Sequence, residues 1–173
     1  MKTIKLSDRL KALADLINAG ASVADIGTDH GHLPVFLALT ETVKSLIASD
    51  ISSGSLDAAR RSADEYNVTD KITFLFAPGL DGISPDEADT IVIAGLGGET
   101  ILGILKDAPW TKRTGLTLIL QPQSKIDLLC RFLYDNGYII KETKSVIDRE
   151  KNYTIILATG IEPESWCKND KSK

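Results

Sequence analysis

Apolar residues along the chain follow two alternating patterns, one with the spacing of a helix face and one of short continuous runs. The first helical pattern predicts a helix over 7–18, where Ser7 or Asp8 can cap the start. The first continuous run predicts a buried strand over 22–26. By the same criteria we expect helices over 34–41, 56–66, 99–106 and 125–136, and strands over 44–50, 72–76, 89–93, 116–120, 138–147 and 153–158.

This alternation of strands and helices predicts an α/β fold with a mostly parallel, seven-stranded sheet that carries helices on both faces. The last two strands flank residues 148–152 and are expected to form a hairpin, which would add an antiparallel edge strand. In such a sheet, ligands bind beyond the carboxyl ends of the strands, so the loops that follow the strands are the place to look for function.

The composition is that of an ordinary globular protein: 173 residues, 43% hydrophobic and 25% charged, with a net charge of −4. These values exclude intrinsic disorder, and the length suits one domain, which we place over 1–160, followed by a polar tail over 161–173. The apolar runs fall far short of the ~20 residues that span a bilayer. No signal peptide is legible, so we expect a cytoplasmic protein without membrane contact.

The two cysteines, Cys130 and Cys167, lie far apart and belong to no C-x-x-C motif. Neither a metal site nor a disulfide framework is therefore expected. The mild acidity argues against a protein that coats nucleic acid by charge alone, but a local basic patch could still bind a folded RNA.

The loop after the first strand combines glycines with acidic residues. Gly27 and Gly31 allow a sharp turn and the close approach of a ligand, although a plain tight turn explains them equally well. Asp50 ends the second strand 23 residues after Gly27, where nucleotide-binding α/β proteins place an acid that binds ribose hydroxyls. Alternatively, Asp50 caps the helix that follows it.

The charge of this region indicates the kind of ligand. Asp25, Asp29 and Asp50 form an acidic rim, which suits a cation such as the sulfonium of S-adenosylmethionine. A phosphate-bearing dinucleotide would be repelled, and the spacing of the glycines is not G-x-G-x-x-G. A nicotinamide-dependent dehydrogenase is therefore disfavoured.

Three segments carry a family resemblance: D-I-G-T-D-H-G-H-L-P at 25–34, I-A-G-L-G-G at 93–98 and L-I-L-Q-P at 118–122. In order and spacing they resemble the signature stretches of the bacterial tRNA (adenine-22-N1)-methyltransferase family, as does L-S-D-R-L at 6–10. The resemblance covers about 5–160. It implies a Rossmann-like class I methyltransferase fold, S-adenosylmethionine as methyl donor, tRNA as partner, and methylation of N1 of an adenine.

The resemblance also implies roles for individual residues. The cofactor-binding set that it implies is Asp25, Gly27, Thr28, Asp50, Ile51, Gly79, Leu80, Ala94 and Gly95. The substrate-binding set is His30, Leu96, Gly97, Gly98, Gln121 and Pro122. Asp29 is the candidate catalytic carboxylate, because methylation leaves a positive charge on the adenine that a nearby carboxylate would stabilise or deprotonate. Two alternatives stay open: 93–98 could be a plain strand-to-helix turn, and the histidines could be structural.

Several positions depart from the family's pattern. Pro78 stands where relatives carry a polar residue near the adenine of the cofactor, and Asp81 is the nearest substitute. Gln123, Cys130 and Phe132 replace the Asn, Arg and Trp of relatives, and the family usually continues after about residue 160 into a helical hairpin. These departures leave two alternatives: a degenerate, non-catalytic cofactor-binding paralogue that acts through interaction, and a methyltransferase with another substrate.

A polynucleotide substrate also needs cations that contact phosphates. The candidates are Lys2, Lys5, Arg9, Lys11, Lys112 and Arg113. Arg60 and Arg61 share a helix with acidic residues and are interpreted as a solvated face, and Trp110 and Trp166 as packed surface rather than base-stacking platforms.

Overall fold

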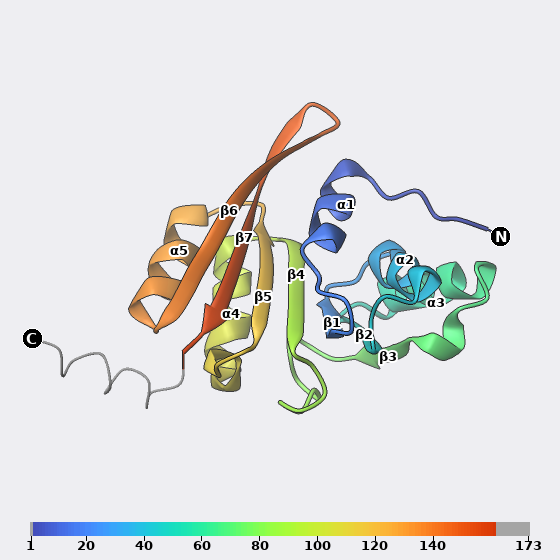
Figure 1. The fold of residues 1–173 in the computed structure, drawn as a ribbon, viewed down its shortest axis with the longest axis horizontal. Coiled ribbons are helices and arrows are strands. Elements are labelled where there is room, and N and C mark those ends of the chain that lie inside the picture. Colours follow the sequence, from blue (N-terminus) through green and yellow to red (C-terminus); the bar gives the residue numbers. More distant parts are fainter. Residues whose placement is uncertain (1, 162–173) are drawn as a thin grey trace, which may run out of the picture.

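The computed structural model describes residues 2–161, which form one twisted seven-stranded sheet in the order β3-β2-β1-β4-β5-β7-β6 (Figure 1). The strands are β1 (Ser22–Ile26), β2 (Ser45–Asp50), β3 (Thr73–Phe76), β4 (Thr90–Leu96), β5 (Thr117–Pro122), β6 (Tyr138–Asp148) and β7 (Lys151–Gly160). The α-helices are α1 (Asp8–Asp15), α2 (His32–Thr40), α3 (Ser53–Glu65), α4 (Gly98–Asp107) and α5 (Ile126–Asp135). Two short 3₁₀ helices are η1 (Thr69–Lys71) and η2 (Pro109–Lys112).

The predicted fold class is confirmed. β1 to β5 pair in parallel, and β7 pairs antiparallel with both β5 and β6. The hairpin thus makes one edge of the sheet antiparallel, with β7 lying between β5 and β6. Figure 1 shows this hairpin projecting beyond the ends of the other strands.

Successive residues of the central strands point to opposite faces of the sheet and pack in two hydrophobic cores, one on each face. Ile91 and Ile93 of β4 pack in one core with residues of α4 and α5, while Val92 packs in the other with residues of α1, α2 and α3. Both faces of the sheet are therefore covered by helices, and the loops at the ends of the strands are the places where a ligand can bind.

Three element boundaries differ from the prediction by three residues, and the others differ by two or fewer. α1 ends at Asp15 rather than at 18, and α3 begins at Ser53 rather than at 56 because the Ser52 hydroxyl caps it by accepting from the Ser55 amide. β4 continues past 93 to Leu96, because its last residues stay in register with Gln121 and Pro122 of β5 across an irregularity.

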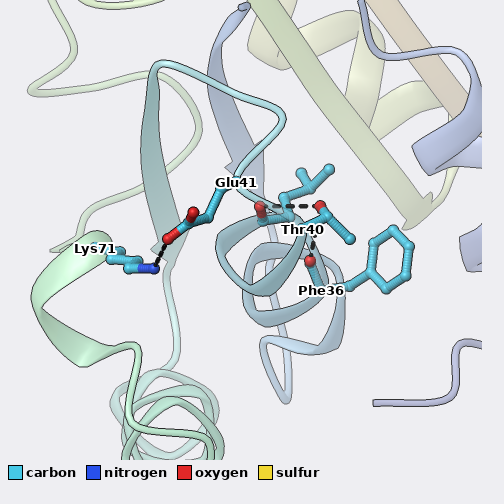
Figure 2. Close-up of polar contacts among 5 residues, drawn as sticks. Phe36, Thr40, Glu41 and Lys71 are labelled. Atoms are coloured by element: carbon cyan, nitrogen blue, oxygen red, sulfur yellow. Dashed lines mark hydrogen bonds and ion pairs between the residues drawn. The ribbon is translucent and has the colours of Figure 1, made fainter. Parts of the chain in front are cut away.

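At the amino-terminal ends of the strands, the segments that lead into β2 and β3 contact each other. Figure 2 shows the Glu41 carboxylate, just after α2, paired with the Lys71 ammonium of η1, and this contact lowers the pKa of Glu41. The Thr40 hydroxyl donates back to the Phe36 carbonyl at 3.1 Å and closes the last turn of α2 (Figure 2). These contacts therefore lie at the end of the sheet opposite the carboxyl ends of the strands.

Among residues 2–161, no helix is long and apolar enough to cross a membrane. The same residues contain no cluster of three or more His, Cys, Asp or Glu side chains that could hold a metal ion. Trp166, Cys167 and most of the tail over 161–173 lie outside the described residues, so the division at residue 160 stays a prediction.

Candidate active site

A cleft of about 1230 Å³ opens at the carboxyl ends of β1, β2 and β4. Its walls come from the loops after these strands, from the start of α1, from the inner side of α4, and from the β6–β7 hairpin near Tyr153. The volume exceeds the ~300–1,000 Å³ of a typical small-molecule site. The cleft therefore has room for a nucleoside cofactor and a second group beside it.

The loop after β1 follows the shape that its glycines predict. Gly27 has a φ of +73°, and its amide and that of Thr28 both donate to the Ser49 carbonyl at the end of β2, at 2.9 and 3.0 Å. Gly31 has a φ of +71° and lies so close to α3 that a Cβ there would approach the Cβ of Ala59 to 2.8 Å. Glycine is thus required at position 31 both by backbone conformation and by space.

Asp50 joins the loops after β1 and β2. One carboxylate oxygen accepts from the Asp29 amide at 3.0 Å, and the other accepts from the Ser52 amide at 2.9 Å. The residue is 8% exposed and borders the cleft. Each carboxylate oxygen has two lone pairs, so both can accept a further hydrogen bond from a ligand. Ser52, not Asp50, caps α3, so the predicted capping role of Asp50 is wrong; its carboxylate holds the turn that leads to the cap and can still bind a ligand.

Asp25 is the most deeply buried carboxylate in the cleft wall, with 6% of its surface exposed. Burial raises its pKa to about 6, against the opposing effect of the Thr28 hydroxyl, which donates to it at 2.8 Å. The nearby Asp50 carboxylate raises this pKa further, and Arg9 lowers it. A buried carboxylate that titrates near neutral pH is typical of a functional site.

The opposite side of the cleft is organised by Gln121, whose side chain is fully buried behind the end of β4. Its amide oxygen accepts from Arg9 Nη1 at 2.9 Å and from the Gly95 amide at 3.1 Å, and its amide nitrogen donates to the Pro122 carbonyl. Gly95 has a φ of +76°. Gln121 therefore fixes the backbone at the point where β4 turns toward α4.

The start of α1 and the hairpin complete this side of the cleft. The Arg9 amide donates to the Asp148 carboxylate at 3.2 Å, and the Arg9 guanidinium lies 5.6 Å from the centre of the Tyr153 ring. All three residues border the cleft. Sequence reasoning listed Arg9 as a phosphate contact and missed Asp148 and Tyr153. The only signal for Arg9 was the family-like L-S-D-R-L segment, and the hairpin residues had none.

Most of the site residues that the sequence predicts come together around the cleft. Those that border it are Asp25, Gly27, Thr28, Asp29, His30, Asp50, Ile51, Gly79, Ala94, Gly95 and Leu96. Asp29 and His30 are exposed at the mouth of the cleft, with Asp29 Oδ1 3.9 Å from His30 Nε2. The rings of His30 and His32 lie 5.8 Å apart.

The other predicted residues lie behind the cleft or beside it. Leu80 is in a hydrophobic core, Gly97 precedes α4, and Pro122 borders a smaller cavity. Gly98 is packed so tightly that a Cβ there would come within 2.5 Å of the Ser124 and Lys125 carbonyl oxygens. Its amide donates to the Ser124 carbonyl, so its observed role is to join two loops.

Among the basic candidates, Lys5 and Arg9 border the cleft. Lys2, Lys11 and Arg113 are engaged elsewhere, with the Glu65 carbonyl, the Asp15 carboxylate and the Ala88 carbonyl respectively. Asp81, the sequence-based substitute for a polar residue at Pro78, does not border the cleft, whereas Pro78 does.

The sequence pattern of the methyltransferase-domain family matches residues 6–156. The chain belongs to this family. It is 35% identical over 159 residues to a curated Bacillus subtilis protein, the tRNA (adenine(22)-N(1))-methyltransferase, and the match covers 91% of this chain and 66% of that relative. The chain thus spans about two thirds of the relative's length, and the resemblance seen in the sequence is confirmed.

Solved structures agree with this assignment of the family. The B. subtilis m1A22 tRNA methyltransferase TrmK superposes with a TM-score of 0.83 at 32% identity, covering 90% of this chain and 67% of that one. M. capricolum TrmK, solved in complex with S-adenosylhomocysteine, superposes with a TM-score of 0.79 at 28% identity, covering 91% of this chain and 71% of that one. The fold around the cleft is therefore that of methyltransferases.

Proposed function

We propose that this chain transfers a methyl group from S-adenosylmethionine to N1 of an adenine in tRNA. One observation carries the proposal: in a chain of the methyltransferase family, Asp50 holds a carboxylate with free lone pairs at the end of β2, facing a cleft of sufficient size. The activity named for the B. subtilis relative supplies the reaction and the substrate class, and the S-adenosylhomocysteine bound to the M. capricolum relative supports the cofactor.

The residues on one side of the cleft fit the cofactor. The Asp50 carboxylate can accept from both ribose hydroxyls while it retains the Asp29 and Ser52 amides. Ile51 follows it with 70% of its surface exposed and offers an apolar face to a purine ring. Asp25 adds negative charge when ionised, which suits the positive sulfonium. When bound, S-adenosylmethionine supplies an activated methyl group.

The opposite side of the cleft would receive the adenine. N1 of neutral adenine has a lone pair and can attack the methyl group directly, so the chief task of the protein is alignment. The backbone from Ala94 to Leu96, fixed by Gln121 at Gly95, forms the wall that would orient the base. We assign to Asp29, which is exposed at the cleft mouth, the role of stabilising the positive charge left on the base or accepting its proton.

Two linked experiments test the proposal. Titration calorimetry of the purified chain with S-adenosylmethionine and S-adenosylhomocysteine should show binding of both. Incubation with unmodified tRNA, followed by nucleoside mass spectrometry, should then yield N1-methyladenosine. Absence of cofactor binding contradicts the assignment of the Asp50 side. Binding without transfer favours the alternative of a non-catalytic, cofactor-binding paralogue. Transfer to another atom or another molecule contradicts the proposal that N1 of an adenine in tRNA is the methyl acceptor.

A further inference from the structure

A second cavity, of about 420 Å³, adjoins the main cleft. It is lined by Pro122, Gln123, Ile126, Lys151, Asn152, Tyr153 and Thr154. Gln123 and Tyr153 border both cavities, so the two share a wall. Its volume lies within the ~300–1,000 Å³ range of small-molecule sites.

The cavity exists because two neighbouring strands diverge. The register between β5 and β7 runs from Thr117 opposite Thr159 to Leu120 opposite Ile156. Beyond that point β5 follows β4, while β7 continues to Lys151 in register with β6. The strand topology thus leaves a space between the end of β5 and the hairpin. This space lies at the same end of the sheet as the cleft.

The side chains around this space are of kinds that proteins use to bind nucleotides. Tyr153 contributes an aromatic ring, which the Arg9 guanidinium contacts at 5.6 Å from the ring centre. Asn152 and Gln123 carry exposed amides, which can donate to and accept from the edge of a base. Lys151 is exposed beside them and can contact a phosphate.

We propose that this second cavity holds the nucleotide next to the target adenosine in the RNA chain. This inference rests on the proposed function and deepens it. An enzyme that acts on a base must take that base out of its stack, which leaves a neighbouring base free to be bound on an aromatic platform. The shared wall of Gln123 and Tyr153 places such a neighbour directly beside the cleft that receives the target.

The test combines protein variants with altered RNA. The variants are Asn152→Ala and Lys151→Ala, and the matched control is Lys144→Ala, an exposed lysine of the same hairpin that borders neither cavity. The substrates are an unmodified tRNA transcript and two versions in which the nucleotide immediately 5′ or 3′ of the target adenosine is abasic. KM for RNA and kcat are measured at saturating S-adenosylmethionine, and calorimetry gives the cofactor affinity of each variant.

With intact RNA, Asn152→Ala should raise KM about 3- to 10-fold, the effect of one lost hydrogen bond, without changing cofactor affinity. One of the two abasic RNAs should raise the KM of the native protein about 5- to 100-fold. On that RNA Asn152→Ala should cause no further change, because the base it contacts is gone. Lys151→Ala should raise KM on all three RNAs, and Lys144→Ala should behave as the native protein does.

Two results would overturn the inference while leaving the proposed function intact: an unchanged KM for Asn152→Ala, or an increase of equal size on intact RNA and on both abasic RNAs. The second result would mean that Asn152 acts through the structure of the hairpin rather than through a base. Failure of the native protein to methylate any of the RNAs would overturn the proposed function, and this inference with it.

Discussion

The two sides of the cleft are built in different ways. On the side of β1 and β2, the hydrogen bonds stay within two consecutive strand–loop segments: Thr28 reaches Asp25 across three positions, Ser52 reaches Asp50 across two, and the Asp29 amide reaches Asp50 across 21. On the side of β4, β5 and the hairpin, Arg9 reaches Gln121 across 112 positions, and its amide reaches Asp148 across 139. The first side is thus built from one short stretch of the chain, whereas the second side brings together residues that are far apart in sequence.

The two sides also differ in charge. Asp25 and Asp50 are both buried on the first side, where burial and, to a smaller extent, the charge of Asp50 raise the pKa of Asp25 at a cost in stability. The second side is centred on the neutral Gln121, whose polar atoms all have partners. The first side is thus suited to attract a cationic cofactor, and the second is suited to hold a backbone in place.

The largest effect is expected at Asp29, which is exposed at the cleft mouth in the loop after β1. Asp29→Asn removes the charge but retains a residue type that tolerates its left-handed φ of 54°. Single-turnover methyl transfer should fall ~10²- to 10⁴-fold, while cofactor affinity changes little. Rapid-quench kinetics with prebound cofactor measures this, with Asp57→Asn on the exposed face of α3 as the control. Equal losses in rate and affinity would make Asp29 a binding residue of the first side.

The next effect is on stability and depends on pH. The pKa of Asp25 is raised from 3.8 to about 6, so its protonated form is favoured in the folded state. The ionised form therefore destabilises the fold: the penalty is absent below about pH 4, grows as pH rises through 6, and is then constant. Asp25→Asn keeps an acceptor for Thr28 and should gain on the order of 3 kcal/mol relative to the native protein by pH 8.

Urea denaturation of both proteins between pH 4 and pH 8 measures this difference. Asp57→Asn serves as the exposed control and should follow the native curve. If the curves for Asp25→Asn and the native protein run parallel over this range, Asp25 does not titrate as the geometry requires.

Asp50→Ala should weaken S-adenosylmethionine binding by about 1.5–3 kcal/mol, the effect of losing hydrogen bonds to a charged group. The substitution also leaves the Asp29 and Ser52 amides without their acceptor. Calorimetry measures the loss, with Asp57→Ala as the control on the following helix. An unchanged affinity would show that Asp50 only joins the two loops.

The smallest effect is on packing at the second side. Gly98→Ala places a methyl group 2.5 Å from two carbonyl oxygens and should destabilise the fold by about 1–3 kcal/mol. Gly103 lies in the same helix with nothing within 4 Å of an added Cβ, so Gly103→Ala should stabilise the fold by about 0.5–1 kcal/mol. Thermal melts distinguish the two. Equal melting temperatures would mean that the loop of Ser124 and Lys125 adjusts freely.

These differences explain what could be predicted from the sequence. The alternating periodicities identified the seven strands and five helices, and the loop from Asp25 to Gly31 was legible because its partners lie in the same short segment or at the end of the next strand. The boundary of β4 at Leu96 was missed because it depends on Gln121 of another strand. Asp148 and Tyr153 were missed because a hairpin brings them to the cleft, and no local pattern reports such a contact.

The division of work between the two sides is tested most directly by measuring cofactor affinity and single-turnover transfer rate in two variants, Asp50→Asn and Gln121→Ala. We expect Asp50→Asn to lower the affinity for the cofactor and to regain the native transfer rate at saturating cofactor. Gln121→Ala should keep its affinity and lose rate at every cofactor concentration, because Gly95 and Arg9 lose their common acceptor. If both variants lose affinity and rate in the same proportion, the two sides of the cleft do not act separately.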